Sequence, residues 1–201
     1  MSTTGTSARA EAGPASAPAL PPVRSHRARW AALVVLVVVA GLVAVLATRP
    51  SAQVASVDSP LVGNQAPVIS GTTVDGSHFA LPAAPGRYVV LNFFASWCVP
   101  CQQEGPAFVA FAFQHRNGSA QLVSVRFNDT VSAVRSYQAT LGATWPTLVD
   151  RSGRLALDYG VKGQPTTFVI APDGRVVAYI VAPVTAAQLD QVIARAEAAH
   201  A

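Results

Sequence analysis

The hydrophobic and polar positions divide the chain into segments of different pattern. Residues 1–29 are rich in Ala, Ser, Thr, Pro and Arg and show no apolar periodicity. Such a segment cannot bury enough surface to offset the entropy of ordering, so we expect a disordered tail. An uncharged apolar run follows, and residues 49–61 then have the Pro, Ser and Asp content of a linker. Residues 62–201 contain short apolar runs separated by turn residues, as expected for one folded domain.

The apolar run Trp30–Ala47 is 18 residues long. This length is enough to cross the hydrocarbon core of a bilayer as a helix, so the run predicts one transmembrane anchor over residues 30–48. Three arginines lie within residues 24–29 and only Arg49 follows the run. The positive-inside tendency therefore predicts a single-pass protein of the cell membrane, with a cytoplasmic N-terminus and the domain outside the cytoplasm.

A cleaved secretory signal peptide is the alternative interpretation of this run. Val45–Ala47 is an acceptable cleavage site. The apolar part of a signal peptide is usually only about 7–15 residues long, which favours the anchor. Both interpretations place the domain outside the cytoplasm.

The pattern after residue 62 predicts strands that alternate with helices. Asp75-Gly76 suits a tight hairpin turn because Gly accepts positive φ. Thr185 and Gln188 fit a capping box at the start of a C-terminal helix. The expected strands cover 68–73, 78–81, 88–95, 122–127, 166–171 and 176–181, and the expected inner helices cover 100–115 and 131–141. This order indicates an α/β or α+β architecture around a mixed sheet.

Charge is distributed unevenly along the chain. The formal net charge is +4, but residues after 60 contain nine Arg or Lys against eight Asp or Glu. The domain is therefore nearly neutral, and it has no basic or aromatic cluster of the kind that binds nucleic acid. We expect no nucleic-acid partner.

The two cysteines form the strongest chemical signal. They lie in Trp97-Cys98-Val99-Pro100-Cys101, directly after an apolar strand and at the start of a helix. A helix N-terminus carries unpaired N–H groups and partial positive charge, which favour a thiolate at Cys98. Cys101 lies one turn further on, where it can close a small disulfide with Cys98 and exchange two electrons with a partner.

Three other interpretations of the cysteines fit the sequence less well. A structural zinc site needs about four ligands, whereas the chain has no second cysteine pair and its histidines are scattered. A purely structural disulfide across so short a loop would stabilise the fold little. A peroxidatic cysteine of the peroxiredoxin type would have Thr or Ser three residues earlier, where this chain has Ala95.

The segment Val89–Glu104 resembles the active-site segment of the membrane-anchored TlpA/ResA/CcmG-like thioredoxins, a redoxin family related to AhpC/TSA. Gly160–Phe168 is similar to the segment that carries the cis-proline of that family, and Asn64–Pro67 is similar to the start of its domain. The resemblance covers residues 62–199. It implies a thioredoxin-like fold, with a mixed sheet flanked by helices and an N-terminal β-hairpin extension.

The resemblance also implies roles for individual residues. Cys98 would be the exposed attacking thiol and Cys101 the resolving thiol. Pro165 would form a cis peptide bond with Gln164, facing the cysteines. Glu104 would be buried near the thiols and tune their acidity. Four residues are assigned to substrate binding: Trp97, Pro100, Gln164 and Pro165. Asn92 stands where cytoplasmic thioredoxins carry a buried Asp.

These observations predict an exported thiol-disulfide oxidoreductase that needs no cofactor beyond its redox-active disulfide. The expected substrates are exported proteins with cysteines, such as apocytochrome c, and a membrane thiol-disulfide protein would supply electrons. The expected direction is reduction. An oxidant that forms disulfides in secreted proteins is one alternative, and a copper-binding thioredoxin-like protein is another, because two thiolates are soft metal ligands.

Overall fold

The computed structural model describes residues 26–47, 59–81 and 86–200. They belong to two units, one within Met1–Pro50 and one within Ser51–Ala201. The first contains the helix α1 (His26–Ala47), which includes the predicted apolar run. Within the described ranges, no helix combines the length and the apolar character required to cross a membrane. Most of the predicted tail and linker lies outside the described residues.

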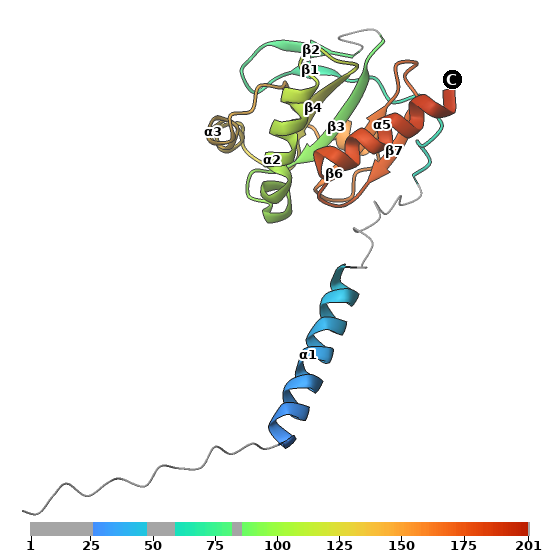
Figure 1. Ribbon diagram of the computed structural model, residues 1–201. Helices are drawn as coiled ribbons and strands as arrows, with labels where there is room; N and C mark the ends of the chain where they lie inside the picture. The colour runs from blue at the N-terminus through green and yellow to red at the C-terminus, as the bar shows by residue number, and fades with distance from the viewer. Residues whose placement is uncertain (1–25, 48–58, 82–85, 201) are drawn as a thin grey trace, which may run out of the picture. The chain divides into compact units, whose positions relative to one another are not determined.

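The second unit alternates strands and helices in the order that the sequence pattern predicts (Figure 1). Its elements are β1 (Ser70–Thr72), β2 (His78–Ala80), β3 (Tyr88–Phe94), α2 (Val99–Gln114), β4 (Ala120–Arg126), α3 (Val131–Leu141), β5 (Thr147–Val149), α4 (Arg154–Asp158), β6 (Thr166–Ile170), β7 (Val176–Ile180) and α5 (Ala186–His200). All the predicted strands and helices of the domain are present. The sequence pattern did not predict β5 and α4.

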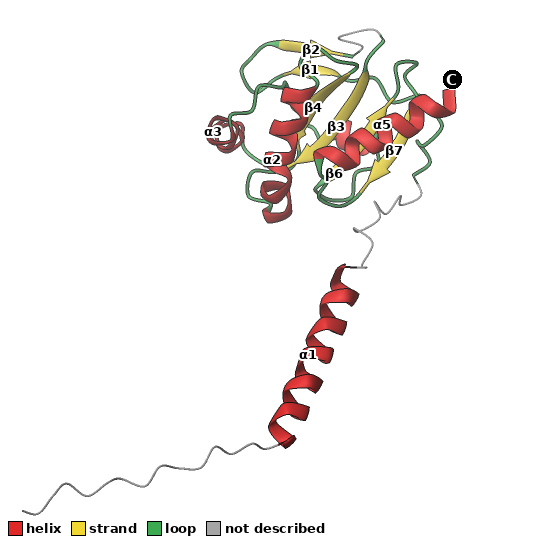
Figure 2. Ribbon diagram, in the orientation of Figure 1, coloured by secondary structure: helices red, strands yellow, loops and turns green. Residues whose placement is uncertain are grey.

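The strands form two sheets (Figure 2). The larger sheet has the order β5-β4-β3-β6-β7, in which β3, β4 and β5 are parallel while β6 and β7 run antiparallel to their neighbours. The smaller sheet is the predicted N-terminal hairpin β1-β2, which turns at Gly76 with φ +93°. This arrangement confirms the mixed sheet with a hairpin extension.

Two apolar clusters cover the two faces of the larger sheet. On one face, Phe108 and Phe111 of α2 and Leu189 of α5 belong to one buried cluster with positions of β3, β4, β6 and β7. Figure 1 shows α2 and α5 side by side on this face. On the other face, Tyr159 after α4 and Ile69 before β1 pack on the alternate positions of the same strands. The central strand β3 is buried along its whole length, as its apolar run predicts.

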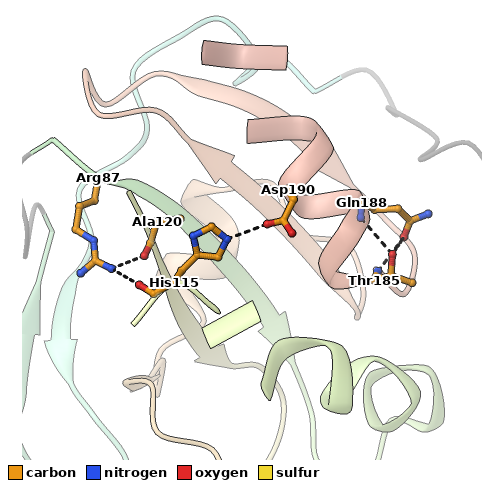
Figure 3. Close-up of polar contacts among 6 residues, drawn as sticks. All are labelled: Arg87, His115, Ala120, Thr185, Gln188 and Asp190. Carbon is orange, nitrogen blue, oxygen red and sulfur yellow. Dashed lines mark hydrogen bonds and ion pairs between the residues drawn. The ribbon is translucent and has the colours of Figure 1, made fainter. Parts of the chain in front are cut away.

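Polar contacts join the C-terminal end of α2 to α5 and cap the N-terminus of α5 (Figure 3). His115 at the end of α2 lies 2.8 Å from the Asp190 carboxylate of α5, and Arg87 donates to the carbonyl of His115. The predicted capping box is present, since the N–H of Thr185 donates to the Gln188 side chain and the N–H of Gln188 donates to the Thr185 hydroxyl. The His115–Asp190 contact and the Arg87 hydrogen bond hold the C-terminal end of α2 against α5 and the start of β3.

Candidate active site

The cysteine pair lies where β3 passes into α2. The chain leaves the buried strand at Phe94, and Cys98 is the N-cap residue of α2 with extended backbone (φ −76°, ψ 111°). Pro100 lies in the first turn, where its missing N–H removes no helical hydrogen bond. The strand thus delivers Cys98 to the positive end of a helix dipole.

Cys98 and Cys101 form a disulfide with Cα atoms 5.2 Å apart. The backbone N–H of Cys101 points at Cys98 Sγ, 3.3 Å away. A thiolate on Cys98 would receive this N–H as a charge-assisted hydrogen bond, which stabilises the anion. Cys101 is 2% exposed and lies deeper than Cys98.

The prediction of an exposed Cys98 is wrong for this oxidised form. Cys98 is only 6% exposed, because its side chain packs in an apolar cluster with Val74, Phe94 and Val134. The carbonyl oxygen of Gln164 also lies 3.8 Å from its sulfur. The accessible apolar surface belongs instead to its neighbours, Trp97 (56% exposed) and Val99 (61% exposed).

The peptide bond between Gln164 and Pro165 is cis, as the resemblance predicts. This bond precedes β6, which pairs with β3, so Gln164 is brought beside Cys98 although 66 residues separate them. Trp97 is held by the loop after β4, since its indole N–H donates to the carbonyl of Asn128 at 3.1 Å. Of the four residues assigned to substrate binding, Gln164 lies beside Cys98 in the fold and Pro165 follows it in the chain. Trp97 and Pro100 are neighbours of the cysteines in the chain.

Glu104 is buried beneath the pair, as predicted, and is 2% exposed. Its two carboxylate oxygens accept hydrogen bonds from the Asn92 amide at 3.0 Å and from the N–H of Val184 at 3.3 Å. Burial raises the pKa of Glu104 from 4.5 to about 8, against the opposing effect of the two hydrogen bonds. The group therefore gains and loses its proton near neutral pH, as a proton acceptor for a thiol must.

A small cavity of about 10 Å³ connects Glu104 with the resolving cysteine. Glu104 and Cys101 both line it, together with Asn92, Ser124 and Tyr137. This volume is about that of one water molecule, and the lining offers several polar partners for one. Glu104 and Cys101 therefore border the same small buried space, which is the placement that proton exchange between them requires.

Sequence reasoning missed several residues that support the site. Asp129 accepts hydrogen bonds from both the N–H and the hydroxyl of Ser96, at 2.6 Å each, and so fixes the turn before Cys98. Tyr137 donates to the carbonyl of Cys101 at 3.4 Å. The sequence around Asp129 and Tyr137 indicates only a turn followed by the helix α3. It gives no sign that these two residues contact the cysteine loop. Elsewhere in the described ranges, no group of three or more His, Cys, Asp or Glu side chains is placed to share a metal ion.

Comparison with known proteins agrees with this geometry. The AhpC/TSA family model matches residues 62–179. The thiol-disulfide oxidoreductase ResA of Bacillus thuringiensis is 30% identical over 129 residues, which cover 64% of this chain and 75% of ResA. The thioredoxin-like protein YneN of Bacillus subtilis is 34% identical over 132 residues, covering 64% of this chain and 76% of YneN.

Solved structures give the same result. The crystal structure of a thiol:disulfide interchange protein of the thioredoxin family from Chlorobium tepidum has a TM-score of 0.61 and 30% identity, covering 69% of this chain and 98% of that one. The fold is thus shared with this solved structure, and the relatives found by sequence are named as thiol-disulfide oxidoreductase or thioredoxin-like proteins. The chain belongs to the AhpC/TSA family and is a thiol-disulfide oxidoreductase of the ResA-like group.

Proposed function

We propose that this oxidoreductase works outside the cytoplasm, anchored by its N-terminal helix, and reduces disulfides in exported proteins such as apocytochrome c. The observation that carries the proposal is the buried Glu104 beside a Cys98–Cys101 pair at a helix N-terminus. A carboxyl group with a pKa of about 8 is partly ionised near neutral pH, and its ionised form is basic enough to take the proton of the resolving thiol. The family resemblance supports the cytochrome type of substrate.

In the first step, the thiolate of Cys98 attacks one sulfur of the substrate disulfide. The substrate S–S bond breaks, a new S–S bond joins Cys98 to the substrate, and the other substrate sulfur leaves as a thiolate. The α2 N-terminus and the N–H of Cys101 stabilise the attacking anion.

In the second step, Cys101 resolves the mixed disulfide. Glu104 accepts the proton of the Cys101 thiol, and the resulting thiolate attacks Cys98 Sγ. The Cys98–Cys101 bond forms, the bond to the substrate breaks, and the second substrate sulfur leaves and takes a proton from solvent. Two electrons have then passed from the protein to the substrate, and a dithiol protein in the membrane would restore them.

The substrate binds where the exposed apolar residues and the cis-proline segment meet. Trp97 and Val99 offer apolar surface next to Cys98. The carbonyl oxygen of Gln164 lies 3.8 Å from the Cys98 sulfur, so an extended substrate segment that reaches the sulfur can pair with this backbone. We assign Pro100 to the same surface because it follows Val99 in the exposed first turn.

The membrane anchor is proposed from the sequence. The uncharged run Trp30–Ala47 and the arginines before it support the anchor and its orientation. The side chains of α1 that are described between Trp30 and Val43 are all exposed, which leaves their apolar surface available to lipid.

The reduction potential of the cysteine pair tests the direction of the reaction. The full chain in detergent would be equilibrated with glutathione buffers, and the oxidised fraction measured by thiol labelling. We expect a potential near that of thioredoxin, about −270 mV, which favours donation of electrons. A value of about −120 mV, as in a strong disulfide oxidant, would overturn the reductase assignment and support formation of disulfides in secreted proteins.

A further inference from the structure

Tyr137 of α3 contacts the helix that carries the cysteines. Its hydroxyl donates to the backbone carbonyl of Cys101 at 3.4 Å, and its ring centre lies 5.9 Å from that of Phe94 at the end of β3. Hydrogen bonds between oxygen atoms are usually about 2.7–2.8 Å long, so this one is weak. Because a hydroxyl hydrogen rotates about its C–O bond, it can turn from this carbonyl toward a stronger acceptor nearby.

The helix leaves room for this hydroxyl at Gly105. A Cβ at this position would clash with the Tyr137 oxygen. Gly105 follows Glu104 directly and lies one turn after Cys101. The missing side chain therefore lets the hydroxyl lie against the turn of α2 that carries both the resolving thiol and the buried carboxyl group.

The same tyrosine lines the small cavity that Cys101 and Glu104 border. Other donors of the lining are already engaged, since the amide groups of Asn92 and Gln138 and the indole of Trp145 donate to other side chains. The Tyr137 hydroxyl is held only by its weak bond to the Cys101 carbonyl. It is thus a donor that can serve the cavity without breaking a good hydrogen bond.

Three titratable side chains meet at this cavity: Cys101 and Glu104 of α2 and Tyr137 of α3. The described residues that line it include no Lys, Arg, His or Asp. The segment before α5 contributes the Val184 N–H, which donates to Glu104. Burial and the charge of Glu104 raise the pKa of Tyr137, so its hydroxyl keeps its proton at neutral pH and remains a donor.

The arginines of the adjoining elements have partners outside this cavity. Arg126 and Arg135 are the charged side chains of β4 and α3, and β3 has none. Arg126 donates to the carbonyl of Asp150, and Arg135 donates to the carbonyl of Val74. Neither arginine lines the cavity. A negative charge formed there is therefore stabilised by hydrogen bonds and not by a counter-ion.

We propose that the Tyr137 hydroxyl turns into the cavity during the resolving step and donates a hydrogen bond to the negative charge that Cys101 and Glu104 exchange. The inference rests on the proposed proton transfer between these two residues and adds a donor to it. When the proton moves from the Cys101 thiol to the Glu104 carboxylate, the charge moves to the Cys101 sulfur. A donor that faces both groups, directly or through one water, stabilises the charge in either place, so the pair loses its proton at lower pH.

The test separates the two steps of exchange in the reduced full chain in detergent. The substrate is a symmetrical disulfide of two nitrothiobenzoate groups. Attack by the Cys98 thiolate forms a mixed disulfide and releases one coloured nitrothiobenzoate ion. Attack by Cys101 on Cys98 Sγ then forms the Cys98–Cys101 bond and releases the second ion. The absorbance therefore rises in two phases, and the rate of each is measured against pH.

Tyr137→Phe removes the hydroxyl and keeps the ring. Tyr159→Phe is the matched control, because it removes another tyrosine hydroxyl, which donates to the carbonyl of Pro67 at 2.9 Å and belongs to a residue packed on the opposite face of the sheet. In Tyr137→Phe the pH midpoint of the second phase should rise by about one unit, and the rate of that phase at pH 7 should fall about tenfold. The first phase should keep the wild-type pH profile, as should both phases of Tyr159→Phe.

A wild-type pH midpoint for the second phase of Tyr137→Phe would overturn the inference. This holds even if the variant is slower at every pH, since a uniform loss indicates only structural support. An equal shift in Tyr159→Phe would also overturn it, and thermal unfolding midpoints check that each variant is folded in the assay. Failure of the proposed proton transfer has a different signature, because Glu104→Gln would then keep the wild-type second phase at pH 7.

Discussion

Replacing Glu104 by Gln removes the buried charge and keeps the shape of the side chain. The pKa of Glu104 is raised from 4.5 to about 8 by burial, so the folded protein holds a proton that the unfolded chain loses above pH 4.5. Stability therefore falls with rising pH across the window from 4.5 to 8 in the wild type, because the native state binds more protons there. Below pH 4.5 both states are protonated and this cost disappears.

The magnitude follows from the two pKa values. Each pH unit within the window costs up to about 1.4 kcal/mol. The wild type should therefore lose roughly 3 to 4 kcal/mol between pH 5 and pH 8 through this group. The substituted amide cannot titrate, but it has one oxygen, so either the Asn92 amide or the Val184 N–H loses its acceptor. That loss costs about 1–3 kcal/mol at every pH. The variant should thus be less stable than the wild type at pH 5 by about 1 kcal/mol and more stable at pH 8 by about 2 kcal/mol.

Urea unfolding of the oxidised full chain at several pH values, followed by tryptophan fluorescence, measures both curves in the same detergent. All other titrating groups are common to the two proteins and cancel in the difference. Parallel curves from pH 5 to pH 8 would refute the buried, protonated carboxyl group.

The same variant has a second consequence for the thiols. The Glu104 carboxylate disfavours a nearby thiolate, so Cys98 in the Gln variant should titrate at lower pH and in a simpler, single transition. Turnover should nevertheless fall, because Cys101 has lost its proton acceptor. Thiolate absorbance against pH and the rate of disulfide reduction, measured on one preparation, check both effects. Wild-type values for both would remove Glu104 from the proton transfer.

Further predictions concern the packing of α2 and the topology. Gly105→Ala places a Cβ too close to the Tyr137 hydroxyl and should lower the unfolding free energy by about 1–3 kcal/mol. Adding Tyr137→Phe to this variant removes the hydroxyl and should restore part of the lost unfolding free energy. In intact cells, a membrane-impermeant thiol reagent should label the reduced cysteines, and labelling only after lysis would contradict export.

The sequence pattern predicted every long element of the domain, because each has its own periodicity or cap. The short elements were not predictable in this way. β5 has three residues, Thr147–Val149, and exists because β4 pairs with it on one side and Thr73 bridges to it on the other. α4 has only five residues and follows Gly153 at φ +71°. It is too short to show a helical period and has no side-chain cap, so the sequence pattern does not predict it.

The residues of the candidate site could be predicted from the sequence, but their burial and contacts could not. The cysteine spacing, the glutamate and the Gln-Pro pair could all be recognised from local sequence and from the family resemblance. Their burial depends on tertiary contacts between distant segments. The second hydrogen bond to Glu104 comes from Val184, 80 residues away, and the Gln164 carbonyl that lies against Cys98 comes from 66 residues away. No local pattern carries these contacts, which is why Cys98 was predicted to be more exposed than it is.

Trapping of the covalent intermediate tests the central claim most directly. The reduced Cys101→Ser and Cys98→Ser variants of the full chain would be mixed with a disulfide-containing protein substrate, and the products separated without reductant. We predict that Cys101→Ser accumulates a mixed disulfide through Cys98, because the resolving thiol is absent, and that Cys98→Ser accumulates none. Accumulation in Cys98→Ser alone, or in neither variant, would contradict attack by Cys98 and resolution by Cys101.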